Sequence, residues 1–160
     1  MVGQTGKSGD NPAVEIAGRI DADNVHRLVA RVYYADTDFS GAVYHARYLE
    51  WLERGRSDFL RLFDVHHTDL QAGSEGETLY WVVRRMEIDF RRAASIDDLL
   101  TVNTSVAHVG GAHVIMSQTV GKDDATLISA VVTAALINAE GKPRRFPNQW
   151  RTRFEAVSTG

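Results

Sequence analysis

The stretch that decides the fold is RVYYADTDFSGAVYHARY, residues 31–48. It continues a segment rich in β-branched and aromatic residues, Leu28 to Tyr34, which predicts a strand. The cluster of Asp, Thr, Ser and Gly from Asp36 to Gly41 predicts a loop. From about His45 to Phe63, apolar residues recur on one side at helical spacing. They predict a single core-facing helix of about five turns.

Beyond residue 76 the pattern changes to strands. Apolar and polar residues alternate in four segments, 86–90, 100–106, 114–120 and 126–138. Gly110-Gly111 is expected to supply the positive φ angles of a tight hairpin, and residues 121–124 another turn. Trp150, Phe154 and Val157 have the spacing of a short amphipathic helix. The order is strand, long helix, then four strands linked by hairpins. This predicts an α+β fold, an antiparallel sheet of about five strands wrapped around one helix.

The composition suits one domain in the cytoplasm. We expect residues 1–26 to form a flexible tail and lead-in, and residues 27–157 to form the single domain. The 160 residues include no cysteine, which excludes disulfides and cysteine nucleophiles. A net charge of −3 gives no support for nucleic-acid binding, and the longest apolar run, 128–137, is too short to span a membrane. His66, His67 and Asp69 match no metal motif, so we expect no metal.

The chemistry is expected in the loop before the long helix. First-turn N–H groups of a helix lack internal partners and carry partial positive charge, so they can hold a developing oxyanion. A carboxylate just before them suits thioester cleavage, because a thiolate leaves without a general acid. The carboxylate would attack the carbonyl or deprotonate water, and the sequence does not choose between these routes. The alternative is structural, since Asp before a helix is commonly a cap or a turn residue.

A longer motif favours the catalytic alternative. Residues 32–56 resemble the start of the Tol-Pal-associated acyl-CoA thioesterases, in the 4-hydroxybenzoyl-CoA thioesterase-like branch of the hotdog superfamily. The motif residues are Val32, Tyr33, Tyr34, Asp36, Thr37, Asp38, Gly41, Val43, Tyr44, His45, Tyr48, Glu53, Arg54 and Arg56. Segments 81–86, 97–100 and 142–147 extend the resemblance. It implies a hotdog fold without a cofactor, with Asp38 as the catalytic carboxylate and Tyr34 and His45 beside it. The backbone N–H of His45 would be the oxyanion donor, and Asp36 would hold the loop.

The resemblance also implies an assembly and a coenzyme A site. Such proteins are homodimers or homotetramers with sites at the subunit interface. Lys142, Arg144 and Arg145 match the positions of basic residues that meet coenzyme A phosphates, although a solvated basic turn is an equal alternative. His113 stands where relatives often carry a small hydroxyl residue, so it is a candidate substrate contact. Two other functions remain open. One is an acyl-thioester hydratase or dehydratase, which would use His45, and the other is a non-catalytic module that binds acyl carrier protein or an envelope partner.

Overall fold

The computed structural model describes residues 17–66, 70 and 76–160. Most of the predicted tail and lead-in at 1–26 therefore lies outside the described residues. His67, Asp69 and most of the predicted connection at 66–76 lie outside them as well. Within the described ranges, no helix is long and apolar enough to cross a membrane.

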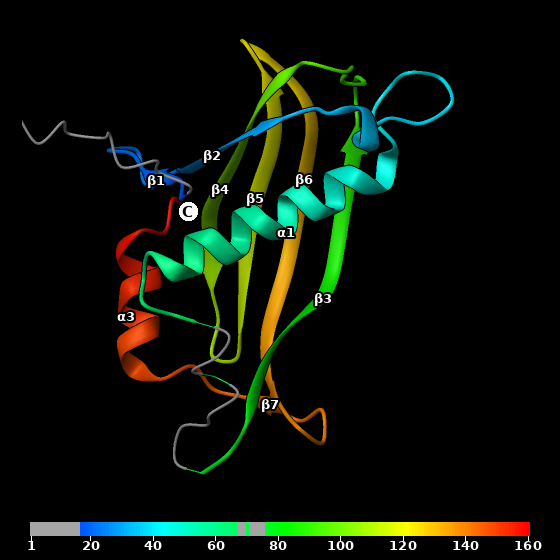
Figure 1. Cartoon of the computed structure of the whole chain (residues 1–160). Coiled ribbons are helices and arrows are strands. Elements are labelled where there is room, and N and C mark those ends of the chain that lie inside the picture. The colour runs from blue at the N-terminus through cyan, green and yellow to red at the C-terminus, as the bar shows by residue number, and fades with distance from the viewer. Residues whose placement is uncertain (1–16, 67–69, 71–75) are drawn as a thin grey trace, which may run out of the picture.

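The chain forms one curved, antiparallel sheet of seven strands with a long helix across one face (Figure 1). The spatial order of the strands is β1-β2-β4-β5-β6-β3, and β7 pairs with β6. The strands are β1 Arg19–Ile20, β2 His26–Arg31, β3 Leu79–Phe90, β4 Leu99–Val109, β5 His113–Lys122, β6 Ala125–Asn138 and β7 Pro143–Arg144. The helices are the 3-10 turn η1 Tyr34–Asp36, α1 His45–Arg61 and α3 Asn148–Ala156. This is the α+β arrangement expected, with five long strands and two short ones.

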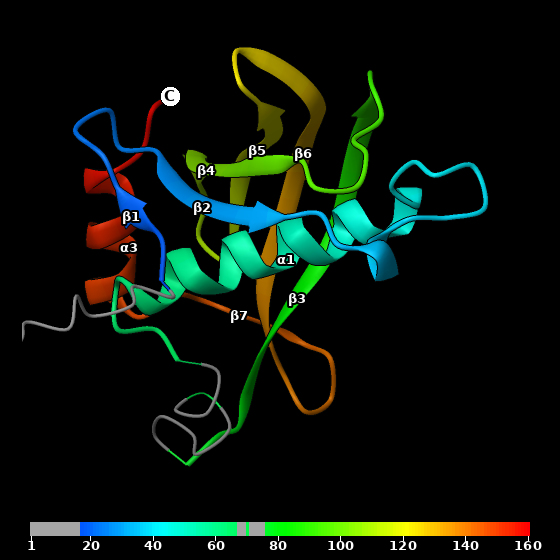
Figure 2. The same ribbon diagram turned by 45° about the horizontal axis from the view of Figure 1, so that its top comes forward.

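Helix α1 divides the core into two clusters along its length. Near its start, Tyr48, Trp51 and Leu52 pack on the sheet. Near its end, Phe59 and Leu60 pack with residues of β5, β6 and α3. Between the clusters, Gly55 allows a close approach, because a Cβ there would lie 2.9 Å from the Val102 side chain. Figure 2 shows the helix lying over the sheet from a second side. The stripe of apolar residues therefore seats the helix as predicted.

The first long strand is shorter than predicted. It ends at Arg31, whereas the prediction ran to Tyr34. The side chain of Asp36 accepts a hydrogen bond from the Tyr33 N–H at 2.8 Å and turns the chain into η1. Tyr33 and Tyr34 are consequently exposed rather than paired in the sheet. A local carboxylate has overridden the β propensity of two aromatic residues.

The predicted series of four strands linked by hairpins is wrong at its first link. β3 pairs with β6 rather than with β4, so residues 91–98 carry the chain across the sheet instead of turning a hairpin. β3 lies at the edge, and no described strand pairs with its other side. The other expected hairpins, β4–β5 and β5–β6, are present.

The expected role of Gly110-Gly111 is also wrong. Neither glycine has a positive φ. Gly110 is instead required by space, since a Cβ there would lie 2.4 Å from the ring of His113. The positive φ of the β5–β6 turn belongs to Asp123, at 52°. Hairpin position was therefore predictable here, but the conformation at each turn was not.

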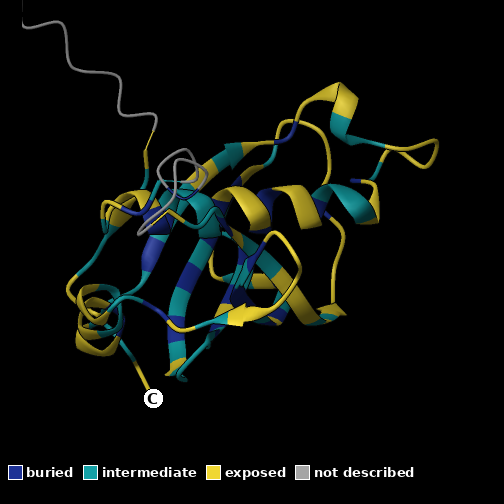
Figure 3. Cartoon of the chain, turned by 90° about the horizontal axis from the view of Figure 1, so that it is seen from below, coloured by how far each residue is buried: buried dark blue, intermediate teal, exposed yellow. Residues whose placement is uncertain are grey.

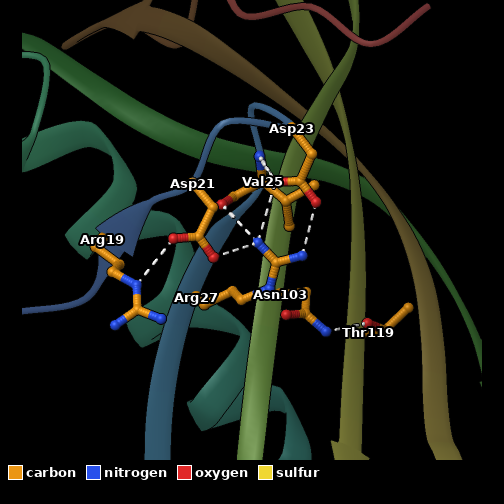
Figure 4. A network of polar contacts seen from close by, with 7 residues as sticks. All are labelled: Arg19, Asp21, Asp23, Val25, Arg27, Asn103 and Thr119. Carbon is orange, nitrogen blue, oxygen red and sulfur yellow. Dashed lines mark hydrogen bonds and ion pairs between the residues drawn. The ribbon is translucent and has the colours of Figure 1, made fainter. Parts of the chain in front are cut away.

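An ion-pair network fixes the turn between β1 and β2 (Figure 4). Arg27 donates to Asp21 and to Asp23, both at 2.7 Å. The hydrogen bond from Arg27 lowers the pKa of Asp23 to about 2. Asn103 and Thr119 lie next to Arg27 on the neighbouring strands and bond each other at 2.9 Å. The network closes the sheet edge opposite β3 and contains no residue of the expected site.

Candidate active site

The loop that carries Asp38 projects beyond the start of α1 (Figures 1 and 2). It is a tight turn, in which the Asp38 N–H donates to Ala42 O at 2.9 Å and the Gly41 N–H donates to Asp38 O at 3.0 Å. Gly41 has a φ of 81°, a conformation that glycine adopts without strain. Phe39 lies fully exposed in this turn. The exposed colouring of the projecting loop is visible in Figure 3.

The Asp38 carboxylate is exposed, ionised and held by one oxygen. Its Oδ1 accepts hydrogen bonds from the Ser40 N–H at 2.8 Å and the Ser40 hydroxyl at 2.5 Å. These bonds, together with the charge of His45, hold the pKa of Asp38 below its ordinary value. Oδ2 has no partner among the described residues. The turn interaction proposed as the structural alternative is thus present, yet it leaves one carboxylate oxygen free to react.

The start of α1 offers unpaired N–H groups. The Tyr44 N–H donates to Asp36 O at 3.0 Å, and the helix begins at the next residue. No side chain caps this start, and the N–H groups of His45 and Ala46 have no acceptor within the described part of the chain. Such groups carry the partial positive charge of a helix N-terminus. They are suited to hold an oxyanion, as expected for His45.

The His45 ring packs among aromatic residues. Its centroid lies 4.6 Å from that of Tyr44 and 6.3 Å from that of Phe90, at the end of β3. The ring makes no hydrogen bond to Asp38 in this structure. Its contribution to the carboxylate is therefore electrostatic, through the lowered pKa of Asp38.

Both the carboxylate and the carbonyl of Asp36 are engaged in holding the loop. Its carboxylate bonds the Tyr33 N–H and pairs with Arg47 at 3.2 Å, while its carbonyl accepts from Tyr44. Tyr34 is mostly exposed, and its carbonyl accepts from the N–H and hydroxyl of Thr37. The Tyr34 ring is therefore free to turn toward a ligand. Asp36 is the structural acid and Asp38 the available one.

The segment at residues 92–98 holds the end of this loop, and the contacts of Ala94 in it were not predicted from the sequence. The buried Tyr48 hydroxyl accepts a hydrogen bond from the Ala94 N–H at 2.9 Å. The Val43 N–H donates to Ala94 O at 2.9 Å, and Ala42 pairs with Ser95. Helix α1 and residues 92–98 thus clamp the chain just after Asp38. A tyrosine on the buried stripe of a helix was the only sequence signal for this contact.

The four predicted substrate contacts gather around β7. Arg144 is engaged, because its guanidinium bonds the Glu77 carboxylate at 2.8–3.1 Å and thereby holds β7 in place. Lys142 and Arg145 are exposed. His113 begins β5, and the Phe146 N–H donates to Gly111 O in the neighbouring turn at 3.3 Å. The basic segment and His113 therefore lie close together, with Lys142 and Arg145 open to a ligand.

One chain does not bring the two groups of predicted residues together. The Asp38 loop lies at one end of the molecule, and the turn between β6 and β7 lies at the other, in both Figures 1 and 2. Strand β3 spans the distance between them, from Leu79 near β7 to Phe90 beside His45. A site that uses both groups therefore needs a second chain.

A cavity between α1 and β3 was not expected from the sequence. It has a volume of about 110 Å³. Its lining residues are Glu53, Arg56, Ser57, Leu60, Trp81, Val82, Val83, Met116 and Ala134. Trp81 lines this cavity, whereas Trp51 is buried in the core. The sequence feature nearest to the cavity is Gly55, which lets the helix approach the sheet closely beside Arg56.

The fold and the loop before α1 are those of one class of protein, the thioesterases. Residues 40–129 match the thioesterase superfamily, and the chain belongs to this family. The match begins after Asp38 and ends before Lys142, so most of the predicted site residues lie outside it. The hotdog thioesterase fold expected from the sequence is confirmed.

Particular relatives narrow the comparison. The chain is 38% identical over 133 residues to the acyl-CoA thioesterase YbgC of Haemophilus influenzae, a match that covers 82% of this chain and 96% of that protein. It is 31% identical over 98 residues to the long-chain acyl-CoA thioesterase FadM of Escherichia coli, covering 60% and 70% of the two chains. The crystal structure of a probable thioesterase from Bartonella henselae has a TM-score of 0.74 and 55% identity, covering 77% of this chain and 99% of that one.

The bonds from Ser40 predict a pH effect. Ser40→Ala removes the hydroxyl donor, so the pKa of Asp38 should rise toward its ordinary value. On acidification, Asp38 would then become protonated at a higher pH than in the wild type. We expect the acid limb of kcat/KM to move to higher pH, with little change at pH 7, where Asp38 stays ionised. Ser117→Ala, on the exposed part of β5, is the matched control. If the acid limb did not move, it would not report the ionisation of Asp38, contrary to the prediction that Asp38 is the reactive carboxylate.

Proposed function

We propose that this protein hydrolyses the thioester bond of acyl-CoA, with Asp38 as the nucleophile or general base. The observation that supports this most is the juxtaposition of the Asp38 carboxylate, with one free oxygen, and the uncapped start of α1. Relatives named as acyl-CoA thioesterases support the substrate class. The direct test is release of coenzyme A thiol by the purified chain with a panel of acyl-CoA substrates.

The chemistry follows from the geometry. The carbonyl oxygen of the thioester points at the N–H groups of His45 and Ala46, which stabilise the negative charge that develops there. Asp38 Oδ2 attacks the carbonyl carbon, or takes a proton from a water that attacks it. The C–S bond then breaks, and coenzyme A leaves as a thiolate without needing an acid. Hydrolysis consumes one water and yields the free acid. Direct attack forms a mixed anhydride with Asp38, which a water then hydrolyses to regenerate the carboxylate. In a single turnover in heavy-oxygen water, attack of that water on the Asp38 carboxyl carbon leaves heavy oxygen in the protein, whereas the route through an activated water leaves the protein unlabelled.

We infer that the complete site contains residues from two copies of the chain. The edge strand β3 presents twelve residues whose outer side is not paired by any described strand. Such an edge readily pairs with another chain, and a two-fold axis would pair β3 with β3 antiparallel. That pairing would bring the Leu79 end of one copy beside the Phe90 end of the other. The Asp38 loop of one chain would then face the basic segment 142–145 of its partner.

Mixing two defective variants tests this arrangement. Asp38→Asn lacks the reactive group, and a Lys142→Ala, Arg145→Ala double variant lacks the proposed phosphate contacts. If each site draws on two chains, heterodimers contain one intact site. Random mixing should then restore about a quarter of the wild-type rate at subsaturating substrate. Refolding the variants separately before mixing is the control. A mixture no more active than the sum of its parts would contradict a shared site.

Two further parts of the proposal concern the cell. We propose acyl carrier protein as an additional carrier of the acyl group, because the same thioester and the same basic segment would serve a phosphopantetheine arm. We also propose the cytoplasm as the compartment, in keeping with a chain that has no cysteine.

A further inference from the structure

The cavity between α1 and β3 contains a half-buried cation, Arg56, with which the Glu53 carboxylate of the same wall forms no ion pair. Arg56 is half-buried, and its guanidinium donates to the Gln118 amide oxygen at 3.0 Å. Within the described ranges it forms no ion pair, and burial lowers its pKa. A desolvated guanidinium normally has more partners than one neutral amide. The Gln118 oxygen engages one of its donors, so the others remain available to a ligand.

A buried donor without a partner belongs to the opposite wall of this cavity. The indole N–H of Trp81 is buried and has no acceptor among the described residues. Unpaired buried donors are rare in folded proteins and call for an explanation. Most of the remaining lining is apolar, with Leu60, Met116 and Ala134. Two donors in an apolar cavity fit a ligand that is mainly hydrocarbon and carries an oxygen acceptor.

The position of the cavity relates it to the reaction. It lies toward the Leu79 end of β3, the end that the proposed two-fold pairing brings beside the partner's Asp38 loop. An acyl group held at that loop would extend toward the cavity. Its volume of about 110 Å³ is smaller than the roughly 150 Å³ of a cavity that binds benzene, so a slender aliphatic end fits better than a ring.

We propose that Arg56 and Trp81 select acyl thioesters whose far end carries an uncharged carbonyl oxygen, that is, oxoacyl-CoA substrates. This inference rests on the proposed function. A carbonyl oxygen has two lone pairs and can accept from both donors. It is uncharged, which matters because the Glu53 carboxylate lines the same wall and accepts a hydrogen bond from Ser57. A terminal carboxylate would meet Glu53 as a like charge.

The test compares matched substrates. Acyl-CoA esters of six and of ten carbons are prepared in three forms, with a methyl end, an oxo group next to the end, or a carboxylate end. The kcat/KM of each is measured by thiol release. We expect the wild type to prefer the oxo form over the methyl form by about tenfold or more at one of the two lengths. Arg56→Met should abolish this preference while still hydrolysing the methyl form. Glu53→Gln should raise the rate with the carboxylate form several-fold.

The controls keep the test decisive. Arg61→Met removes a positive charge from the exposed end of the same helix and should leave the preference intact. Arg56→Lys keeps the charge but lacks the fork of donors, and it replaces Arg56→Met if that variant fails to fold. The inference would be overturned if the wild type had similar kcat/KM values for the oxo and methyl forms at both lengths, or if the Arg56 variants kept the wild-type preference. Either result would leave the proposed function intact. If no acyl-CoA releases thiol with the wild type, the proposed function itself fails.

Discussion

Replacing Asp38 by asparagine should lower kcat for acyl-CoA hydrolysis by about 10² to 10⁴. The amide oxygen of asparagine can still accept the hydrogen bonds from Ser40, so the turn should keep its shape. The amide can neither attack a thioester nor accept a proton from water. The loss should therefore appear in kcat, with KM changing little, because coenzyme A is expected to contact a different segment. Thiol-release kinetics at saturating substrate measure it.

Two other variants make this result specific. Asp124→Asn, in the exposed β5–β6 turn, changes the same charge away from the site and should have no effect on the rate. His45→Ala should retain most activity, because the proposed oxyanion donor is its backbone N–H, which alanine keeps. If His45→Ala abolished activity while Asp38→Asn kept it, the hydratase alternative would be favoured and Asp38 would lose its assignment.

The sequence predicted the parts of this fold that depend on local pattern. The apolar stripe from His45 onward predicted the helix, because a helix that buries one face has apolar residues at helical spacing. The alternating segments predicted β4, β5 and β6 for the same reason. The loop at 36–41 was predictable from its turn residues, whereas the choice of Asp38 over Asp36 as the catalytic acid is a prediction from the motif.

Features set by distant contacts were not predictable. β3 lies at the sheet edge and pairs with β6, which is distant from it in the sequence. Local residue patterns carry no information about such a pairing. Arg144 looked like a free cation until Glu77, sixty-seven residues away, was seen to bind it. The half-buried position of Arg56 was not predictable, because the sequence does not show that Gly55 lets this turn of the helix approach the sheet closely.

Phe59→Ala should destabilise the protein by about 3 to 5 kcal/mol. Phe59 is fully buried near the end of α1, with its ring 4.9 Å from that of Phe63 and 6.4 Å from that of Phe154. Its loss leaves a cavity where α1, α3 and the sheet meet, and surrounding aromatic rings cannot collapse freely into it. The cost is a large share of the roughly 5 to 15 kcal/mol that holds such a domain folded. Urea unfolding at fixed protein concentration measures it.

The control and the activity of this variant separate folding from chemistry. Leu62→Ala, at an exposed position three residues further along the chain, should cost less than about 1 kcal/mol. Phe59 lies in the cluster at the far end of α1 from His45 and Asp38. The folded fraction of Phe59→Ala should therefore hydrolyse acyl-CoA at a near wild-type rate per folded molecule at low temperature. A stability loss below about 1 kcal/mol would show that the aromatic cluster relaxes, contrary to its close packing. A stable but inactive variant would mean that the end of α1 contributes to the site directly.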